Sequence, residues 1–185
     1  MKVYSIYILN KAGGLIYQND VNAGLNKLSA NDYLVLAGTL HGVHAISARL
    51  NPTINGKDTT SEANASPNAQ ILTTGRFQDS NGNRSGLHSI ETDLFNLYVF
   101  QSLTGIKFIV ITSPNPVVYN IQTVKKREDV IASKGELNKS YEEANGVFKQ
   151  LYVIYSDYVM KDPFYSLDMP IKSHLFDAKV KELIS

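Results

Sequence analysis

Residues 94–112 read LFNLYVFQSLTGIKFIVIT, and this stretch decides the fold. Its first part, Leu94 to Gln101, is typical of a strand that is covered on both sides, because successive side chains alternate between two apolar faces. One face takes Phe95, Leu97 and Val99, and the other takes Leu94, Tyr98 and Phe100. Thr104-Gly105 supplies a turn, and Lys107 to Thr112 forms the next strand. The pattern therefore predicts a β-hairpin.

A second hairpin is predicted at the start of the chain, where residues 3–17 read VYSIYILNKAGGLIY. Val3 to Leu9 is apolar on both faces, which indicates a central strand. Residues 11–14 favour a turn because their paired glycines tolerate positive φ, and residues 15–17 return as a strand. Leu87 to Glu91 is a candidate for a further strand.

Two long helices are expected, each bounded by capping or breaking residues. The first is capped by Ser29 or Asn31 and ends at Asn51-Pro52. Its inner face repeats at helical spacing and takes Tyr33, Leu36, Leu40, Val43 and Leu50. The second helix runs from Glu142 to Met160 and must stop before Pro163.

A final helix, capped by Ser173, turns Phe176, Val180, Leu183 and Ile184 inward. The order of two strands, a helix, three strands and two helices predicts an α+β fold with a five-stranded antiparallel sheet between helices. We expect a single domain over residues 1–185. Residues 51–86 are rich in Asn, Ser, Thr, Gly and Pro and predict a flexible insertion. A second polar loop, with room for a short helical piece, is expected at about 114–139.

Composition excludes several classes of function. Hydrophobic residues make up 43% and charged residues 19% of the 185 residues, as in an ordinary soluble globular protein. The formal net charge of +1 gives no electrostatic basis for binding nucleic acid or an acidic membrane surface. The absence of cysteine excludes disulfides, zinc-thiolate sites and thiol nucleophiles. No stretch is long and apolar enough to cross a bilayer, and Met1 to Leu9 fits a strand better than a signal peptide.

Motifs for catalysis or cofactor binding are absent from the sequence. Neither G-x-G-x-x-G, nor G-x-x-x-x-G-K-[ST], nor G-x-S-x-G occurs. His41 and His44 lie three residues apart on the first helix, yet a metal site needs at least three convergent ligands. His88, Ser89 and Asp93 contain the residue types of a triad, but side chains on one strand cannot converge as a triad requires.

The remaining chemical candidate is a carboxylate pair among Asp157, Asp162 and Asp168. Such a pair suits acid–base chemistry, although polar residues gathered at the end of a helix explain the cluster more simply. We therefore expect no catalytic, cofactor-binding or metal-binding residues.

The first helix has no formally charged residue from Tyr33 to Ala48, whereas a helix that only backs a sheet should have a charged outer face. The expected outer face takes Ala37, Gly38, His41, Ala45 and Ala48. Its lack of charge favours contact with another protein, and burial under the insertion or a neighbouring helix is the alternative. Around the end of the second helix gather Tyr152, Tyr155, Tyr158, Met160, Phe164, Tyr165 and Met169. These large, adaptable side chains suit either an interface or a well-ended core helix.

Four collinear motifs resemble those of one family. They are NKAGGLIY at 10–17, LHGVHAI at 40–46, LTGIKF at 103–108, and YSDYVMKDP at 155–163 followed by MPI at 169–171 and LFD at 175–177. Together they resemble the sybindin (synbindin) family of longin subunits in the TRAPP vesicle-tethering complex. The match covers the chain except its two polar loops, and the Asn-rich insertion resembles the variable insertion of fungal members.

The resemblance implies a longin, or profilin-like, fold with one helix on one face of the sheet and two on the other. It implies a scaffold in the TRAPP core, beside a sister longin subunit and a subunit that carries a buried acyl chain. The assembled core is the nucleotide-exchange factor for a Rab GTPase of ER-to-Golgi transport. The chain itself would be non-catalytic, cytoplasmic, and peripheral at cis-Golgi and endoplasmic reticulum membranes.

On the same basis, we expect contacts to the GTPase or a partner at Tyr155, Asp157, Tyr158, Lys161, Asp162 and Pro163. Packing against other subunits is expected at Leu40, His41, His44 and Ala48. No cofactor and no nucleic acid is expected among the ligands.

Two other classes of protein remain open. Another longin module would bind sorting peptides as an adaptor small subunit, or SNARE peptides as a SNARE-type domain, although a SNARE would continue past Ser185 into a heptad helix and an anchor. The second alternative is a small-molecule sensor or enzyme on a profilin-like sheet. A co-purifying ligand, or catalysis by the isolated chain, would favour it.

Overall fold

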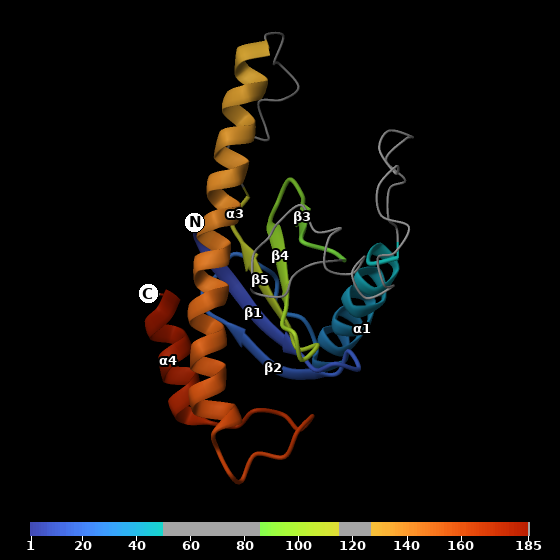
Figure 1. The fold of residues 1–185 in the computed structure, drawn as a ribbon, viewed down its shortest axis with the longest axis vertical. Helices are drawn as coiled ribbons and strands as arrows, with labels where there is room; N and C mark the ends of the chain where they lie inside the picture. Colours follow the sequence, from blue (N-terminus) through green and yellow to red (C-terminus); the bar gives the residue numbers. More distant parts are fainter. Residues whose placement is uncertain (50–85, 115–126, 185) are drawn as a thin grey trace, which may run out of the picture.

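A five-stranded antiparallel sheet forms the centre of the fold (Figure 1). The computed structural model describes residues 1–49, 86–114 and 127–184, with the backbone alone for residues 127–138. The strands lie in the order β2-β1-β5-β4-β3. Their bounds are β1 Val3–Leu9, β2 Leu15–Asp20, β3 Ser89–Glu91, β4 Asn96–Gln101 and β5 Lys107–Thr112. The predicted insertion at 51–86 lies outside the described residues except for Gly86.

Both predicted hairpins are confirmed, and they meet in the middle of the sheet. β1 pairs with β2, β4 pairs with β5, and β5 also pairs with β1. Ile109 on β5 therefore stands between Tyr7 on β1 and Val99 on β4. The two central strands are apolar on both sides because helices cover both faces of the sheet.

β3 and β4, at one edge of the sheet, begin later in the sequence than their pattern predicts. Thr92 N donates to Phe95 O at 3.0 Å and Phe95 N donates to Thr92 Oγ1 at 3.0 Å, so residues 92–95 form a tight turn. β4 therefore starts at Asn96, and Leu94, predicted on a covered face, is 76% exposed. β3 keeps only the last three residues of the predicted strand.

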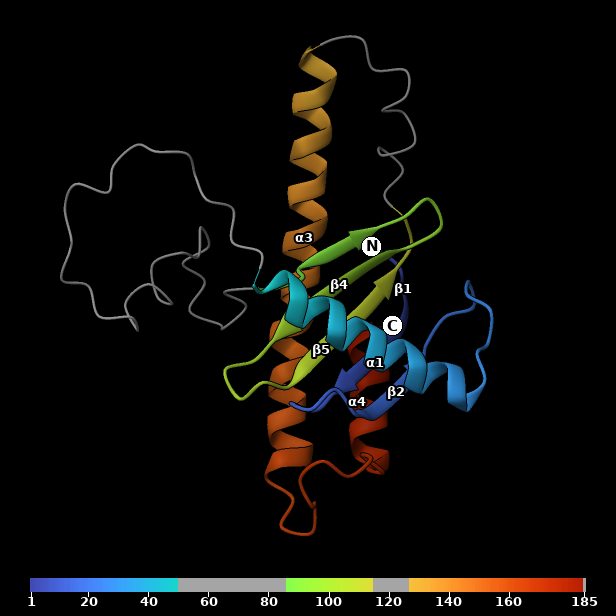
Figure 2. The ribbon, with the colours of Figure 1, turned by 90° about the vertical axis from the view of Figure 1, so that its right-hand side faces the viewer.

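One helix covers one face of the sheet and two helices cover the other, as predicted (Figures 1 and 2). α1, Ala30–Ser47, begins at the predicted cap Ser29. The Ser29 Oγ accepts from Asp32 N at 3.3 Å, and the Asp32 carboxylate accepts from Ser29 N at 3.2 Å. α1 ends before the predicted break at Asn51-Pro52, which lies outside the described residues.

The opposite face packs against α3, Arg127–Tyr155, and α4, His174–Ile184. α3 begins at Arg127 rather than Glu142, so its backbone is helical through half of the region predicted as a polar loop. Figure 1 shows this part of α3 extending beyond the sheet, where a helix needs no apolar stripe. None of the helices in the described ranges combines the length and apolarity needed to cross a membrane.

α3 continues into a short π-helix, Ser156–Met160, before the loop that leads to α4. α4 begins where predicted, because Ser173 Oγ accepts a hydrogen bond from Phe176 N at 3.3 Å. The elements and their layers confirm the expected α+β, longin-like fold.

Two apolar cores lie on the two faces of the sheet. The core beneath α3 and α4 contains the fully buried Phe108, Phe148 and Phe176. Within it, the rings of Phe108 and Tyr155 meet edge to face, with centroids 5.5 Å apart. The core beneath α1 takes Tyr7, Leu9, Tyr33, Ala37, Leu40, Leu97, Val99, Ile109 and Ile111.

The inner face of α1 differs from the prediction. Its buried residues are Tyr33, Ala37, Leu40 and His44, whereas Val43, predicted inside, is 41% exposed. Apolar residues occur on every side of this helix, so their spacing fits more than one inner face. The side of α1 that faces the sheet is the one on which His44 hydrogen-bonds with Gln101 and Leu87.

Candidate partner-binding surfaces

The outward side of α1 is apolar and exposed. Val35 is 59% exposed and Ile46 is 63% exposed, on the side of the helix that lies away from the sheet. Figure 2 views the molecule from this side, with α1 in front of the sheet. The α1 face, as we use the term, consists of Leu34, Val35, Gly38, Gly42, Val43 and Ile46.

Two properties suit the α1 face to close contact with protein. Asp32, in the first turn, is the only formally charged residue of the helix, so the face itself is uncharged. A Cβ added to Gly38 or Gly42 would meet nothing within 4 Å, so these backbone segments lie bare at the surface. The sequence therefore indicated an uncharged outer surface correctly, but it misplaced Ala37, which is buried.

The four residues predicted for subunit packing lie mostly inside the chain. Leu40 and His44 are buried on the inner side of α1. The His41 ring lies against the backbone of Gly13, and its Nδ1 is buried with no hydrogen-bond partner among the described residues. Ala48 caps the end of α1 and is half-buried. Leu40 and His44 thus support the α1 face rather than form it, and contact of these four residues with another subunit stays a prediction.

Basic side chains gather at the end of the sheet beneath α1. Lys107 on β5 is buried, its Nζ donates to Gly105 O at 3.2 Å, and burial lowers its pKa. Burial also lowers the pKa of His41 and of His44, and the positive charge of Lys107 lowers both further. Both imidazoles are therefore mainly neutral at pH 7, which lets them pack beside a buried ammonium group.

A second exposed apolar surface surrounds the loop between the π-helix and α4. Phe164 at the start of this loop is 94% exposed. The 160–175 surface, as we name it, consists of Met160, Phe164, Leu167, Met169 and Leu175. The sequence did not indicate Leu167 or Leu175 as part of this surface, because Leu167 stands alone between polar residues and Leu175 adjoins the inward-facing Phe176.

Hydrogen bonds fix the loop that presents the 160–175 surface. Asp162 Oδ1 accepts from Phe164 N at 2.9 Å, and Tyr165 OH donates to Met169 O at 2.8 Å. Farther along, Ile171 N donates to Ile16 O on β2 at 2.8 Å, which ties the loop to the sheet. A loop that is already ordered would lose little conformational freedom on binding.

The residues predicted to contact a GTPase or partner surround this loop, with one exception. Tyr155 is buried in the core, and burial raises its pKa to about 12. Tyr158 is half-buried and packs against the same core. Asp157 and Lys161 are exposed and form an ion pair with an Oδ1–Nζ distance of 2.5 Å. Asp162 and Pro163 are exposed at the start of the loop.

The candidate catalytic groups do not converge. Asp157 pairs with Lys161, while Asp162 accepts a backbone hydrogen bond, so each carboxylate serves its own local contact. His88 Nδ1 lies 3.5 Å from Tyr141 OH on α3. Within the part of the chain that the structure describes, no group of three or more His, Asp or Glu side chains is placed to hold a metal ion.

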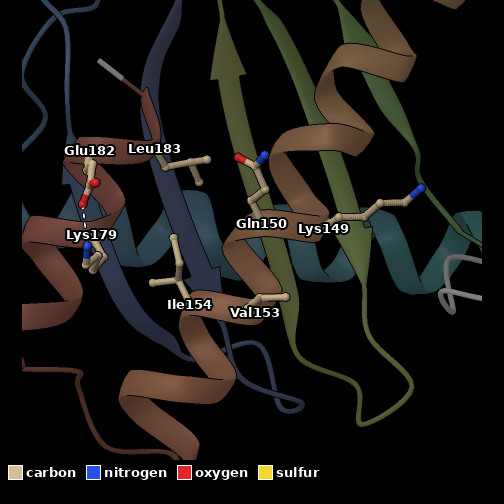
Figure 3. A pocket seen from close by; sticks show the side chains of 7 residues that line it. All are labelled: Lys149, Gln150, Val153, Ile154, Lys179, Glu182 and Leu183. Carbon is tan, nitrogen blue, oxygen red and sulfur yellow. Dashed lines mark hydrogen bonds and ion pairs between the residues drawn. The ribbon is translucent and has the colours of Figure 1, made fainter.

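A shallow groove of about 600 Å³ runs between α3 and α4 (Figure 3). Its lining residues are Lys149, Gln150, Val153, Ile154, Lys179, Glu182 and Leu183. Ile154 and Leu183 approach each other from the two helices, and the ion pair of Lys179 Nζ with Glu182 Oε2 at 2.7 Å lies on the α4 side. The groove marks the seam of helix packing.

Similarity to known proteins extends along the whole chain. The model of the "Sybindin-like family" matches residues 3–131 and 130–185. The Trafficking protein particle complex subunit 4 of Dictyostelium discoideum is 35% identical over 184 residues, which cover 100% of this chain and 97% of that protein. The subunit 4 of Bos taurus is 31% identical over 228 aligned positions, which cover 98% of this chain and 93% of that protein. The subunit 1 of Dictyostelium discoideum is 25% identical over 177 residues, or 94% of this chain and 88% of that protein.

Proposed function

Because this chain belongs to the sybindin-like family, we propose that it is a core scaffold subunit of a TRAPP complex. In this role it packs against a sister longin subunit and an acyl-carrying subunit, and it contributes a platform for guanine-nucleotide exchange on a Rab GTPase of ER-to-Golgi transport. It works in the cytoplasm, at cis-Golgi and endoplasmic reticulum membranes that it reaches through the complex. Full-length similarity to subunit 4 proteins supports this role.

The α1 face is the observation on which the proposal rests. Its four large side chains are between 41% and 63% exposed, with no charge among them. When a partner covers such a surface, burial of apolar area favours the complex by roughly 25 cal/mol for each Å² removed from water. An uncharged patch with bare glycine backbone suits a permanent subunit contact, since the cores of such interfaces are depleted in charge. We therefore assign the α1 face to subunit packing.

The 160–175 surface supplies a second place for a partner. Phe164 stands almost fully exposed on an ordered loop, as an aromatic anchor of an interface would. The exposed Asp157, Lys161 and Asp162 border it and give it a polar rim, and Pro163 is exposed beside Phe164. We assign this surface to the GTPase or to a second subunit.

Nucleotide exchange requires no bond cleavage by this chain. A complex promotes release of nucleotide when it binds the nucleotide-free GTPase more tightly than the nucleotide-bound form. A rigid scaffold contributes by holding contact surfaces in a fixed relation, so that little ordering remains when the GTPase arrives. The central β1–β5 pairing and the helices on both faces provide this rigidity.

Co-expression with the other core TRAPP subunits tests the proposal. Complex formation is measured by size-exclusion chromatography, and exchange by release of fluorescent GDP from the cognate Rab. The variants Val35→Lys and Ile46→Lys place a charge on the α1 face. Leu94→Lys is the control, because Leu94 is more exposed than either residue but lies in the turn before β4. We expect assembly and exchange to fail with the first two variants and to persist with the control.

Omission of the chain should abolish exchange, and undiminished exchange without it would refute the assigned role. Binding of acidic dileucine peptides by the isolated chain would instead favour an adaptor module. A ligand that co-purifies, or turnover by the isolated chain, would favour a sensor or enzyme.

A further inference from the structure

The His44 side chain joins three elements through two hydrogen bonds. Its Nδ1 accepts from Leu87 N at 3.2 Å, and its Nε2 lies 2.6 Å from Gln101 Oε1 on β4. A backbone N–H can only donate, so Nδ1 must be unprotonated. Nε2 then carries the proton and donates to Gln101. The geometry therefore selects one neutral tautomer of the ring and links α1, β4 and the residues that lead into β3.

The His44 ring is tightly enclosed. It is 4% exposed, and the backbone of Gly86 lies against it with a φ of +97°. A Cβ on Gly86 would stand 2.6 Å from the ring Cε1, so only glycine permits this approach. The ring cannot turn to offer another nitrogen to Leu87 unless residues 86–87 move.

Among the residues that the structure describes, the titratable groups that face this ring are basic. They are His41 on α1 itself, Lys107 on β5 and His88 beside Leu87. From the β1–β2 turn, the Lys11 side chain packs beside Gly105, the residue whose carbonyl holds the Lys107 ammonium group. A second proton on His44 would therefore remove the acceptor of the Leu87 hydrogen bond and place a positive charge near the Lys107 ammonium group.

We propose that His44 is a proton-sensitive clasp, which holds the C-terminal half of α1 and residues 86–87 to the sheet only while its ring is neutral. Acidification opens the clasp and frees the end of α1 that carries Val43 and Ile46. The sheet centre, which has no part in the clasp, stays closed. The consequence for partner binding through the α1 face rests on the proposed function, but the opening itself does not.

The direction of the effect follows from proton linkage. Burial is the main reason why the pKa of His44 lies below its ordinary value of 6.5 in the closed state. An opened state therefore takes up a proton first as the pH falls. The clasp is fully effective above pH 6.5 and weakens below it, by up to about tenfold in the opening constant per pH unit until the closed-state pKa is reached.

Amide hydrogen exchange of the full chain, followed by NMR between pH 7.5 and 5.5, tests the proposal. Protection of the Leu87 amide, corrected for the intrinsic pH dependence of exchange, should fall up to about fivefold between pH 6.5 and 5.5, and up to about tenfold between pH 7.5 and 5.5. Protection of the central Val110 amide should change less. In the same titration, the His44 ring should show a proton on Nε2 and a midpoint below 6.5.

Two variants and a control make the test specific. In His44→Gln, which cannot titrate, the acid-induced loss of Leu87 protection should shrink, while His174→Gln, at an exposed histidine of α4, should leave it unchanged. Lys107→Met removes the neighbouring cation and should raise the His44 midpoint toward 6.5. If His44→Gln fails to fold, the shift of the His44 midpoint in Lys107→Met tests the proposal instead.

A His44 midpoint at or above 6.5, a ring protonated on Nδ1, or Leu87 protection that is independent of pH would overturn the clasp. Each of these readouts needs no partner protein. Failure of the clasp proposal can therefore be distinguished from failure of the proposed function, because the first is read from His44 and Leu87 in the isolated chain and the second from assembly with TRAPP subunits.

Discussion

Replacing both glycines of the α1 face by alanine should stabilise the isolated chain and weaken its assembly. Gly38 and Gly42 lie inside a helix, where glycine is less favourable than alanine by about 0.8–1.0 kcal/mol. Added methyl groups would meet nothing within 4 Å, so no steric clash offsets this gain. The double variant should therefore raise the free energy of unfolding by roughly 1.5–2 kcal/mol, or the melting temperature by roughly 3–8 °C for a chain of this size.

The same two methyl groups should oppose close approach of a partner. If another subunit packs against bare backbone at Gly38 and Gly42, each methyl forces it outward, and overpacking of this kind costs about 1–3 kcal/mol. Affinity should then fall by about tenfold or more, since 1.4 kcal/mol corresponds to a factor of ten. Thermal and urea unfolding of the isolated chain measure the first effect, and co-purification with the partner subunit measures the second.

Gly146→Ala is the matched control for this prediction. Gly146 lies in α3, far from the α1 face in sequence, and a Cβ there also meets nothing within 4 Å. It should stabilise the chain by about 1 kcal/mol and leave assembly intact. Lower stability of the double α1 variant would refute the structural reasoning, and unchanged assembly would show that no partner approaches these glycines closely.

Three further predictions follow from the core, the loop and the buried tyrosines. Phe148→Ala should lower the free energy of unfolding by about 3–5 kcal/mol, because it empties a fully buried site, and urea unfolding would detect this loss. Phe164→Ser should leave the melting temperature unchanged while it weakens co-purification with a TRAPP subunit or the Rab, since Phe164 contacts solvent and not the core. Burial raises the pKa of Tyr7 and of Tyr155 to about 12. The free energy of unfolding should therefore be independent of these two groups below pH 10 and should fall above it, by about 1.4 kcal/mol per pH unit for each group, because the unfolded chain loses their protons first. Urea unfolding at pH 9 to 11.5 measures this fall.

The sheet could be predicted from the sequence because its central strands are apolar on both faces. Few other structures accommodate runs such as Lys107 to Thr112 or Val3 to Leu9, and the glycine turns fixed the order of pairing. Helix starts at Ser29 and Ser173 were predictable for a different reason, since a capping side chain acts within its own turn.

Other features depend on distant contacts, which a local pattern cannot reveal. The inner face of α1 was misplaced because the partners of His44, at Leu87 and Gln101, lie more than forty residues away. The first half of α3 was missed because it projects beyond the sheet and has no apolar stripe. Missing charge predicted an uncharged outer side of α1, but only the packing of Ala37 and His44 shows which side of the helix is exposed.

The hydrogen bond from Ile171 N to Ile16 O reduces the risk of aggregation through the edge of the sheet. An open sheet border invites any extended peptide to add as a further strand, which is a common route to aggregation. On one side, the loop before α4 occupies a carbonyl of β2. On the other, β3 spans only three residues and offers a short template. Strand addition along the described edges of the sheet is therefore restricted, which lowers the tendency of a copy without bound partners to aggregate through them.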